Sequence, residues 1–362
     1  MKPVKQIAAL ACVLALLTGL AGCALPAPEA SAPPEPSPAA VPVPEPAPEP
    51  SPEPAPEPTP SPPPSPPPKN AIVLEEEIDW ICGVPWTDPG WTAYGPEGED
   101  LSEKVKISGR IREWRQGDQT LNYTLSDRNG LIASAARTVH VRPQQIPEAA
   151  EPAAGTIYLT FDDGPCENTD KVLAVLEKYG VKATFFIVAR KVKYLDRLPR
   201  IREGGHTIGI HAHTHPNQDY SGFYRNEDAY FTDFLNAQRV LYEYTGEYAY
   251  CARFPGGTKT ASFLAGTLKG KYGELYGILH DMGITSYDWN LQPESGSKTT
   301  EGTLSDFQRG LSPEGWYIVL QHDTRLFSVE ALDQMISWAL EQGYRFSAIE
   351  PTTPELHFRK AE

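Results

Sequence analysis

The apolar and polar positions divide the chain into four stretches with different patterns. An uncharged apolar run at 7–20 is followed by a proline-dominated stretch at 24–69. Between 71 and 142 the pattern consists of short β-favouring runs separated by turn signals. From Thr156 onward, short apolar runs typical of buried strands alternate with segments of helical apolar spacing. The pattern predicts a targeting segment, a spacer, a small β domain and a larger α/β domain.

The N-terminus has the pattern of an export signal. Lys2 and Lys5 precede the apolar run, which is too short for a typical membrane span. Residues 20–23 read Leu-Ala-Gly-Cys and resemble the lipobox of bacterial lipoproteins, which implies cleavage after residue 22 and a lipid on Cys23. An ordinary secretory signal with an incidental cysteine is the alternative. Either interpretation places the mature chain outside the cytoplasm, and the lipobox predicts a lipid anchor in the bacterial membrane.

The stretch from 23 to 69 is predicted to be a disordered spacer behind the anchor. The chain has 37 prolines, and 22 of them lie between 24 and 69. Proline has no N–H for a helix or ladder, so an extended chain of about 3.1 Å per residue, roughly 140 Å at most, is expected. Such a spacer would hold the rest of the chain away from the membrane, although low complexity without a function is the alternative.

A small all-β domain is predicted at 70–145. Residues 121–125 alternate between apolar and polar side chains, 127–130 supply a turn, and a second strand ends at 138–141. The region resembles bacterial surface immunoglobulin-like modules, which implies a small sandwich that acts as a spacer, with or without a contact to the cell wall. His140 is interpreted as a surface residue of a strand and not as a ligand.

The last domain, predicted at 152–362, alternates strands and helices. Apolar runs at 156–161, 183–188, 283–287 and 317–320 predict strands, and 169–179 has helical spacing that ends at Gly180. Repeated strand–helix units predict a parallel sheet or barrel whose function lies at the carboxyl ends of the strands.

Acidic and imidazole side chains gather in two places of this domain. Asp162 and Asp163 follow the first strand, where two adjacent carboxylates are costly unless a cation neutralises them. His211 and His215 are four residues apart, which predicts that both lie on one face of a helical turn. Two imidazoles and one carboxylate would leave coordination positions open, as in catalytic metal sites. Zinc is the first choice from the ligand types, and Co, Mn, Ni and Fe remain alternatives.

Five short motifs occur in this domain in a specific order. They are TFDDGP at 160–165, HAHTH at 211–215, RFPGG at 253–257, DW at 288–289 and LQHD at 320–323. Each motif alone is weak, and a strand-end turn, a structural ion pair or a buried structural histidine would explain it. The ordered set is specific, and over 156–350 the sequence resembles the polysaccharide deacetylase family, carbohydrate esterase family four. The resemblance implies a distorted (β/α) barrel.

The resemblance implies a role for each motif residue. The metal ligands would be Asp163, His211 and His215. Asp162 would be the general base that takes a proton from a metal-bound water, and Arg253 would pair with it. His322 would be the general acid that protonates the leaving amine, and Asp288 would orient it. The substrate pocket would use the N–H of Gly256 for the oxyanion and the side chains of Trp289 and Leu320 as walls.

Two features of the site stay open at the level of sequence. The family usually has Ser or Thr where this chain has Ala212, which puts the rigidity of the metal-binding loop in doubt. His206 and His213 are interpreted as neighbours and not as ligands. Cys166 and Cys251 flank two loops that should face the site, so a disulfide and free thiols are both open.

The function that this organisation implies is metal-dependent removal of N-acetyl groups from a cell-envelope polysaccharide. Peptidoglycan N-acetylglucosamine is the first choice, because the spacer would carry the domain into the wall. The alternatives are action on chitin oligomers, poly-N-acetylglucosamine or acetylated xylan, and a glycan-binding module without activity. The formal charge of −15 excludes a general nucleic-acid binder. The oligomeric state is left open.

Overall fold

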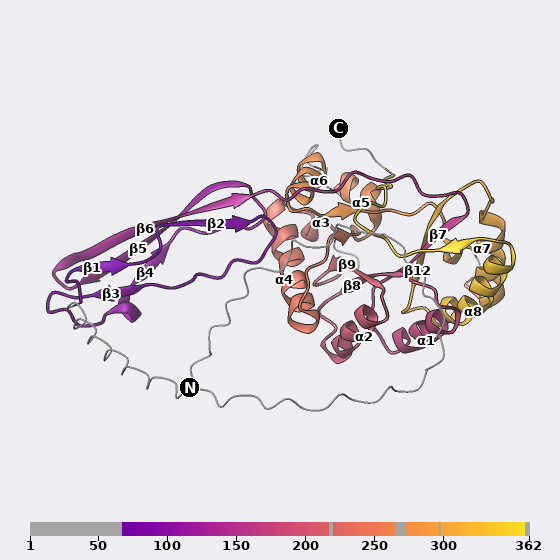
Figure 1. Ribbon diagram of the computed structural model, residues 1–362, viewed down its shortest axis with the longest axis horizontal. Helices are drawn as coiled ribbons and strands as arrows, with labels where there is room; N and C mark the ends of the chain where they lie inside the picture. Colours follow the sequence, from indigo (N-terminus) through magenta and orange to yellow (C-terminus); the bar gives the residue numbers. More distant parts are fainter. Residues whose placement is uncertain (1–66, 217–219, 265–271, 297, 359–362) are drawn as a thin grey trace, which may run out of the picture. The chain divides into compact units, whose positions relative to one another are not determined.

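Figure 1 shows the computed structural model, which describes residues 67–216, 220–264, 272–296 and 298–358. The predicted signal segment, the anchor Cys23 and nearly all of the proline-rich spacer lie outside the described residues. Among the helices that the structure describes, none combines the length and the apolar character that a membrane crossing would need.

The first domain of the described chain is all-β, as predicted. A two-stranded antiparallel sheet pairs the first and third strands, and a four-stranded sheet has the order β2-β6-β5-β4. Within the larger sheet only the β2–β6 pair is parallel. The elements are β1 (Ala71–Val73), β2 (Glu77–Ile81), β3 (Thr92–Tyr94), a 3-10 turn (Ser102–Lys104), β4 (Lys106–Ser108), β5 (Gly117–Asp127) and β6 (Gly130–Arg142).

The long hairpin formed by β5 and β6 confirms the predicted strand–turn–strand unit. Leu121, Tyr123 and Leu125 are buried on one face of β5, which explains the alternation in the sequence. The turn is closed by Asp127, whose carboxylate accepts hydrogen bonds from two backbone N–H groups of the following residues. His140 lies on strand β6 and pairs with carboxylates of the two neighbouring strands.

The second domain is built on a seven-stranded parallel sheet, which confirms the predicted α/β architecture. The order is β11-β10-β9-β8-β7-β12, and β13 also pairs with β7. The strand predicted at 283–287 is only two residues long. The strands are β7 (Thr156–Asp162), β8 (Thr184–Val188), β9 (Thr207–Ala212), β10 (Cys251–Ala252), β11 (Thr285–Ser286), β12 (Tyr317–His322) and β13 (Arg345–Phe346).

Helices lie around these strands (Figure 1). The helix predicted at 169–179 is confirmed, and Gly180 ends it with a left-handed φ of 65°. The helical elements are α1 (Thr169–Tyr179), α2 (Leu198–Glu203), α3 (Tyr220–Phe223), α4 (Glu227–Thr245), α5 (Gly257–Leu264), α6 (Tyr272–Asp281), α7 (Thr300–Gly310) and α8 (Leu326–Glu341), with 3-10 segments η2 (Val192–Arg197) and η3 (Pro293–Ser295).

Strand β7 separates the apolar core from a polar interior. All its residues are buried, but Leu159 and Phe161 join the hydrophobic core whereas Thr160 and Asp162 bind the guanidinium of Arg253. Alternate residues of a strand point to opposite faces of its sheet. Since β12 runs parallel to β7 with His322 opposite Asp162, both side chains lie at the same end of the sheet. The interior face at the carboxyl ends of the strands therefore carries the site.

The three cysteines in the described part of the chain, Cys82, Cys166 and Cys251, are buried free thiols. The open question about a disulfide between the last two is therefore answered in favour of free thiols.

Candidate metal centre and active site

The residues of the candidate site come from the carboxyl ends of neighbouring strands. Asp162 ends β7, His322 ends β12, and Arg253 directly follows β10. Asp163 comes immediately after β7 and has a positive φ of 69°. Aspartate tolerates this left-handed conformation better than most residues do. Because of this turn, the carboxylates of Asp162 and Asp163 have different neighbours although the two residues are adjacent in the sequence.

The predicted helical turn that carries both histidines is wrong. His211 belongs to strand β9, and His215 lies in the loop that leaves this strand. Strand pairing continues to the end of β9 because Ala212 still pairs with β8. The loop then bends, so that the centroids of the two imidazole rings lie 5.2 Å apart and the ring planes meet at an angle of 37°. A spacing of four residues therefore brings the imidazoles together through a bent loop and not through a helix.

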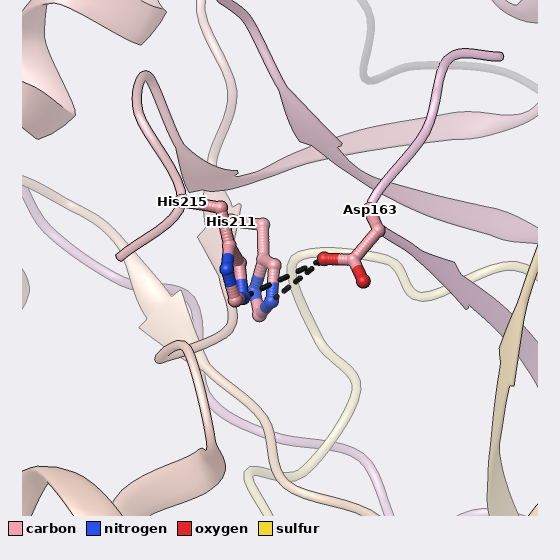
Figure 2. A group of neighbouring side chains, drawn as sticks. All are labelled: Asp163, His211 and His215. Atoms are coloured by element: carbon pink, nitrogen blue, oxygen red, sulfur yellow. Dashed lines mark ion pairs between the residues drawn. The ribbon is translucent and has the colours of Figure 1, made fainter. Parts of the chain in front are cut away.

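Figure 2 shows the carboxylate of Asp163 facing both imidazoles. Asp163 Oδ1 is 3.7 Å from Nε2 of His211 and 3.6 Å from Nε2 of His215. This oxygen is buried and accepts no hydrogen bond from the described residues. On the other side of the His211 ring, Nδ1 is 2.8 Å from the carbonyl oxygen of Arg253. A carbonyl can only accept, so Nδ1 carries a proton, and Nε2 is the ring nitrogen that faces Asp163.

The donor set fits a divalent cation. Among the described residues, Asp163, His211 and His215 form the group whose ligand atoms lie within 4.8 Å of one another. Two ligands at 2.0–2.2 Å from a tetrahedral zinc ion would lie about 3.4 Å apart, close to the separations found here. A carbonyl that orients a ligating imidazole is also typical of metal sites. The geometry therefore brings the three predicted ligands together, and none of the other described residues joins them in this group.

Asp233 of helix α4 stabilises the loop between His211 and His215. Its two carboxylate oxygens accept hydrogen bonds from the backbone N–H groups of His213 at 2.7 Å and Thr214 at 2.9 Å. These bonds tie the segment that follows Ala212 to helix α4. The segment is therefore held in place although Ala212 has no hydroxyl group.

The second carboxylate, Asp162, is held by Arg253. The Nη1 atom of Arg253 donates to Asp162 Oδ1 at 2.8 Å, and both side chains are almost fully buried. The guanidinium also donates to the backbone carbonyls of Tyr287 and Asp288. Asp162 Oδ2 remains 3.9 Å from Nε2 of His211. The predicted Arg253–Asp162 pair is therefore present, and the other oxygen of Asp162 faces the candidate ligand His211.

The predicted partner of His322 is wrong. Nδ1 of His322 lies 2.6 Å from Oε2 of Glu294, whose side chain is fully buried. Asp288 accepts hydrogen bonds from both the N–H and the hydroxyl of Thr258 and from the N–H of Phe358. Its own N–H donates to the carbonyl of Leu356, which fixes this segment beside the C-terminal segment of the chain. The hydrogen bonds of the Asp288 carboxylate thus hold the start of helix α5 and the C-terminal segment, and not His322.

The three predicted pocket residues have different surroundings. Leu320 is buried and precedes His322 by two residues on β12, so both point to the same face of the sheet. The ring of Trp289 lies 5.6 Å from the guanidinium carbon of Arg253. Gly256 is exposed, with a positive φ of 76°, and a Cβ there would meet Thr260 at 2.9 Å. The positive φ and the short distance to Thr260 explain why a glycine occupies this position.

The site environment shifts the pKa values of its ionisable groups in different directions. Burial would raise the pKa of Asp163, but the nearby histidines and Lys191 outweigh it and lower the pKa. Burial lowers the pKa of His215, and the neighbouring His211 adds to this effect. Burial would also lower the pKa of His322, but the hydrogen bond to Glu294 and the charge of Asp162 raise it overall.

Sequence reasoning missed two residues of the site, Glu294 and Asp233. Glu294 belongs to the polar stretch after Trp289, which looks like a rim loop. Asp233 lies on a helix that carries several other acidic residues. Neither position has a motif, so only the three-dimensional path of the chain identifies them.

Comparisons with known proteins identify the family to which the chain belongs. A family model described as "Polysaccharide deacetylase" matches residues 149–272, and one described as "Bacterial surface protein, Ig-like domain" matches 75–141. The putative polysaccharide deacetylase YheN of Bacillus subtilis is 30% identical over 206 residues, which are 56% of this chain and 70% of the relative. The chain belongs to the polysaccharide deacetylase family.

Two further members of the deacetylase family extend the comparison. A peptidoglycan-N-acetylglucosamine deacetylase of Bacillus cereus is 30% identical over 196 residues, covering 53% of this chain and 68% of the relative. The crystal structure of the catalytic domain of peptidoglycan N-acetylglucosamine deacetylase from Eubacterium rectale has 32% identity and a TM-score of 0.54. That similarity covers 59% of this chain and 96% of the solved chain. The deacetylase fold thus accounts for the second domain.

Proposed function

We propose that this protein is a metal-dependent hydrolase that removes N-acetyl groups from N-acetylglucosamine in peptidoglycan. The observation that carries the proposal is the buried Asp163 Oδ1, which faces two imidazole nitrogens and accepts no hydrogen bond from the described residues. The Asp162–Arg253 pair and His322 lie beside it. The names of the relatives in Bacillus cereus and Eubacterium rectale support the choice of peptidoglycan.

Asp163, His211 and His215 would hold the ion, and zinc suits these donors, with Co, Mn, Ni and Fe as alternatives. A divalent ion supplies Lewis acidity, which polarises an amide carbonyl and lowers the pKa of water towards about 7. The carbonyl of Arg253 keeps the His211 ring in the tautomer that ligation requires.

Asp162 is the general base in this proposal. Its Oδ1 is fixed by Arg253, and its Oδ2 faces the ligand side, so Oδ2 accepts the proton of the attacking water. Fixing one oxygen also keeps the other in place during the proton transfer.

His322 is the general acid. Nδ1 is bound to Glu294, so Nε2 is the nitrogen that faces the site, 4.0 Å from Asp163 Oδ2. The raised pKa of His322 favours the protonated ring that an acid needs at neutral pH. The C–N bond breaks with its electron pair on nitrogen, and the proton from Nε2 completes the amine.

The pocket would position the acetyl group. The N–H of Gly256 would donate to the developing oxyanion, and Trp289 and Leu320 would contact the methyl group. Asp288 would stabilise this part of the pocket. It holds Thr258, which follows Gly256 and Gly257, and it holds Phe358, whose ring packs against Trp289.

The rest of the chain would deliver this domain to its substrate. Cys23 would carry the lipid anchor in the bacterial membrane, and 23–69 would be the spacer. The immunoglobulin-like module would extend the reach or contact the wall. The relatives named as cell-wall deacetylases support action outside the cytoplasm.

The test is acetate release from purified peptidoglycan by the full chain, before and after removal of metal with a chelator. We expect release that the chelator abolishes and that Zn²⁺, Co²⁺, Mn²⁺, Ni²⁺ or Fe²⁺ restores to different extents. Chitin oligomers, poly-N-acetylglucosamine and acetylated xylan form the comparison panel. Greater activity on one of these would replace the proposed substrate, and glycan binding without acetate release from any of them would contradict a hydrolase.

A further inference from the structure

Glu294 has an unusual position for a carboxylate in a loop. It lies in the 3-10 segment η3, yet its side chain is fully buried. Both of its oxygens are used. Oε1 accepts from the backbone N–H of His322 at 2.8 Å, and Oε2 contacts Nδ1 of His322 at 2.6 Å and Nη1 of Arg325 at 2.7 Å.

These contacts define the orientation of the His322 ring. Because an ionised carboxylate only accepts hydrogen bonds, Nδ1 of His322 carries a proton that points to Glu294. The same carboxylate holds the backbone of His322, so the ring is fixed relative to its own main chain. The remaining nitrogen, Nε2, then faces Asp163 and the interior of the site. Arg325 holds the carboxylate from the solvent side, with about a third of its own side chain exposed.

We propose that Glu294, and not Asp288, is the positioning residue that aims Nε2 of His322 at the leaving nitrogen, and that Arg325 holds Glu294 in place. This inference rests on the proposed hydrolysis. Glu294 does not touch the substrate, so it acts through the acid. Its effect should therefore appear only in reactions whose leaving group has to be protonated.

The substitution Glu294→Gln tests this chemistry with little change in shape. One end of the amide is an N–H₂ donor, which would face either the N–H of His322 or its protonated Nδ1. Each orientation therefore removes one of the two bonds that Glu294 makes to His322, and both remove the negative charge beside Nδ1, so the ring is held less firmly.

We expect kcat for acetate release from N-acetylglucosamine oligomers to fall about 100-fold, the lower end of the range for general-acid catalysis. KM and the bound metal per chain should stay unchanged.

The decisive readout is a second substrate, 4-nitrophenyl acetate. Nitrophenolate is a good leaving group that departs without a proton, so this reaction does not need the acid. We expect Glu294→Gln to keep most of its activity on the ester while it loses the amide reaction. Equal losses on both substrates, or loss of the metal, would show a merely structural role and overturn the inference.

Two further variants complete the experiment. Glu301→Gln makes the same change at an exposed position of the nearby helix α7 and should leave both reactions unchanged. Arg325→Gln removes the outer support without a buried change, and we expect a selective loss of a few fold on the amide alone. If Glu294→Gln does not fold, equal amide and ester activities of Arg325→Gln relative to wild type overturn the inference.

The outcomes also separate this inference from the proposed function. A wild-type chain that releases no acetate from any acetylated sugar contradicts the proposed function, whatever the variants do. A wild-type chain that is active, together with a Glu294→Gln variant that is equally active on the amide, contradicts only the role of Glu294.

Discussion

The two ends of strand β9 each carry a buried histidine, and the two rings have different surroundings. At the amino end, Nδ1 of His206 accepts a hydrogen bond from the N–H of Ala183 at 3.2 Å, and its ring packs edge-on against Phe185. Burial and the charge of Lys182 lower the pKa of His206 to about 4, so the ring is neutral. At the carboxyl end, His211 is fixed by a carbonyl and faces Asp163.

The difference shows that neighbours, and not residue type or burial, give a histidine its role. The neighbours of His206 are the ring of Phe185 and the charge of Lys182, which both favour a neutral imidazole with a structural role. Nε2 of His211 and a carboxylate oxygen of Asp163 face each other, an arrangement that suits the binding of a cation. The parallel sheet creates this contrast because it brings the carboxyl ends of all its strands to one side.

The largest expected effect is the difference between two single variants, His211→Ala and His206→Ala. We expect His211→Ala to lose stoichiometric metal and to release no acetate above background, because one of three ligands is gone. His206→Ala is the matched control on the same strand and should keep its metal at neutral pH. Elemental analysis of both purified chains measures this, and metal retained by His211→Ala would break the comparison.

The next effect concerns the base. We expect Asp162→Asn to lower kcat for acetate release by about 10²–10⁴-fold, the usual contribution of a general acid or base. The amide can still accept a hydrogen bond from Arg253, so the fold and the three metal ligands should be retained. Steady-state kinetics together with the metal content test this. An active Asp162→Asn chain would exclude Asp162 as the base.

A smaller effect is expected from the connection between α4 and the metal-binding loop. We predict that Asp233→Ala weakens metal affinity by about 10–100-fold, as typically found when a residue that supports a ligand is lost. Glu243→Ala, at an exposed position of the same helix, is the control. Competition with a chelator of known affinity measures both variants. Equal affinities would mean that the loop holds its shape without Asp233.

The smallest effect concerns the amino end of β9 and appears only in acid. The folded pKa of His206, about 4, lies below its ordinary value of 6.5. As the pH falls, the unfolded chain therefore binds a proton at a higher pH than the folded chain does. The free energy of unfolding decreases as the pH falls from 6.5 towards 4. We expect this loss to be up to about 3 kcal/mol greater in the wild type than in His206→Gln. Urea unfolding at several pH values tests this, and parallel curves for the two chains would contradict it.

The candidate metal-binding side of the site was predictable from sequence because its residues follow apolar strands. The runs that end at Asp162 and Ala212 are buried on both faces, so their carboxyl ends had to meet at one edge of a parallel sheet. The exception is the backbone at His211 and His215, where a spacing of four residues fits both a helical turn and the bent loop that the structure contains.

The acid side was predicted less well because its geometry depends on a loop. Glu294 reaches His322 only through the path of the segment after Trp289, and nothing in its local pattern distinguishes it from a rim residue. Asp288 was assigned to His322 by resemblance, but its hydrogen bonds to Thr258 and Phe358 determine its position instead. Contacts made between loops depend on backbone paths that apolar periodicity does not encode.

The central claim is that one divalent ion binds where Asp163 faces His211 and His215. Anomalous diffraction from crystals grown with zinc measures this directly. The account predicts a single ion at about 2.0–2.2 Å from Oδ1 of Asp163 and from Nε2 of both histidines. A fully occupied zinc on other side chains, or no zinc at this position at saturating concentration, would contradict it.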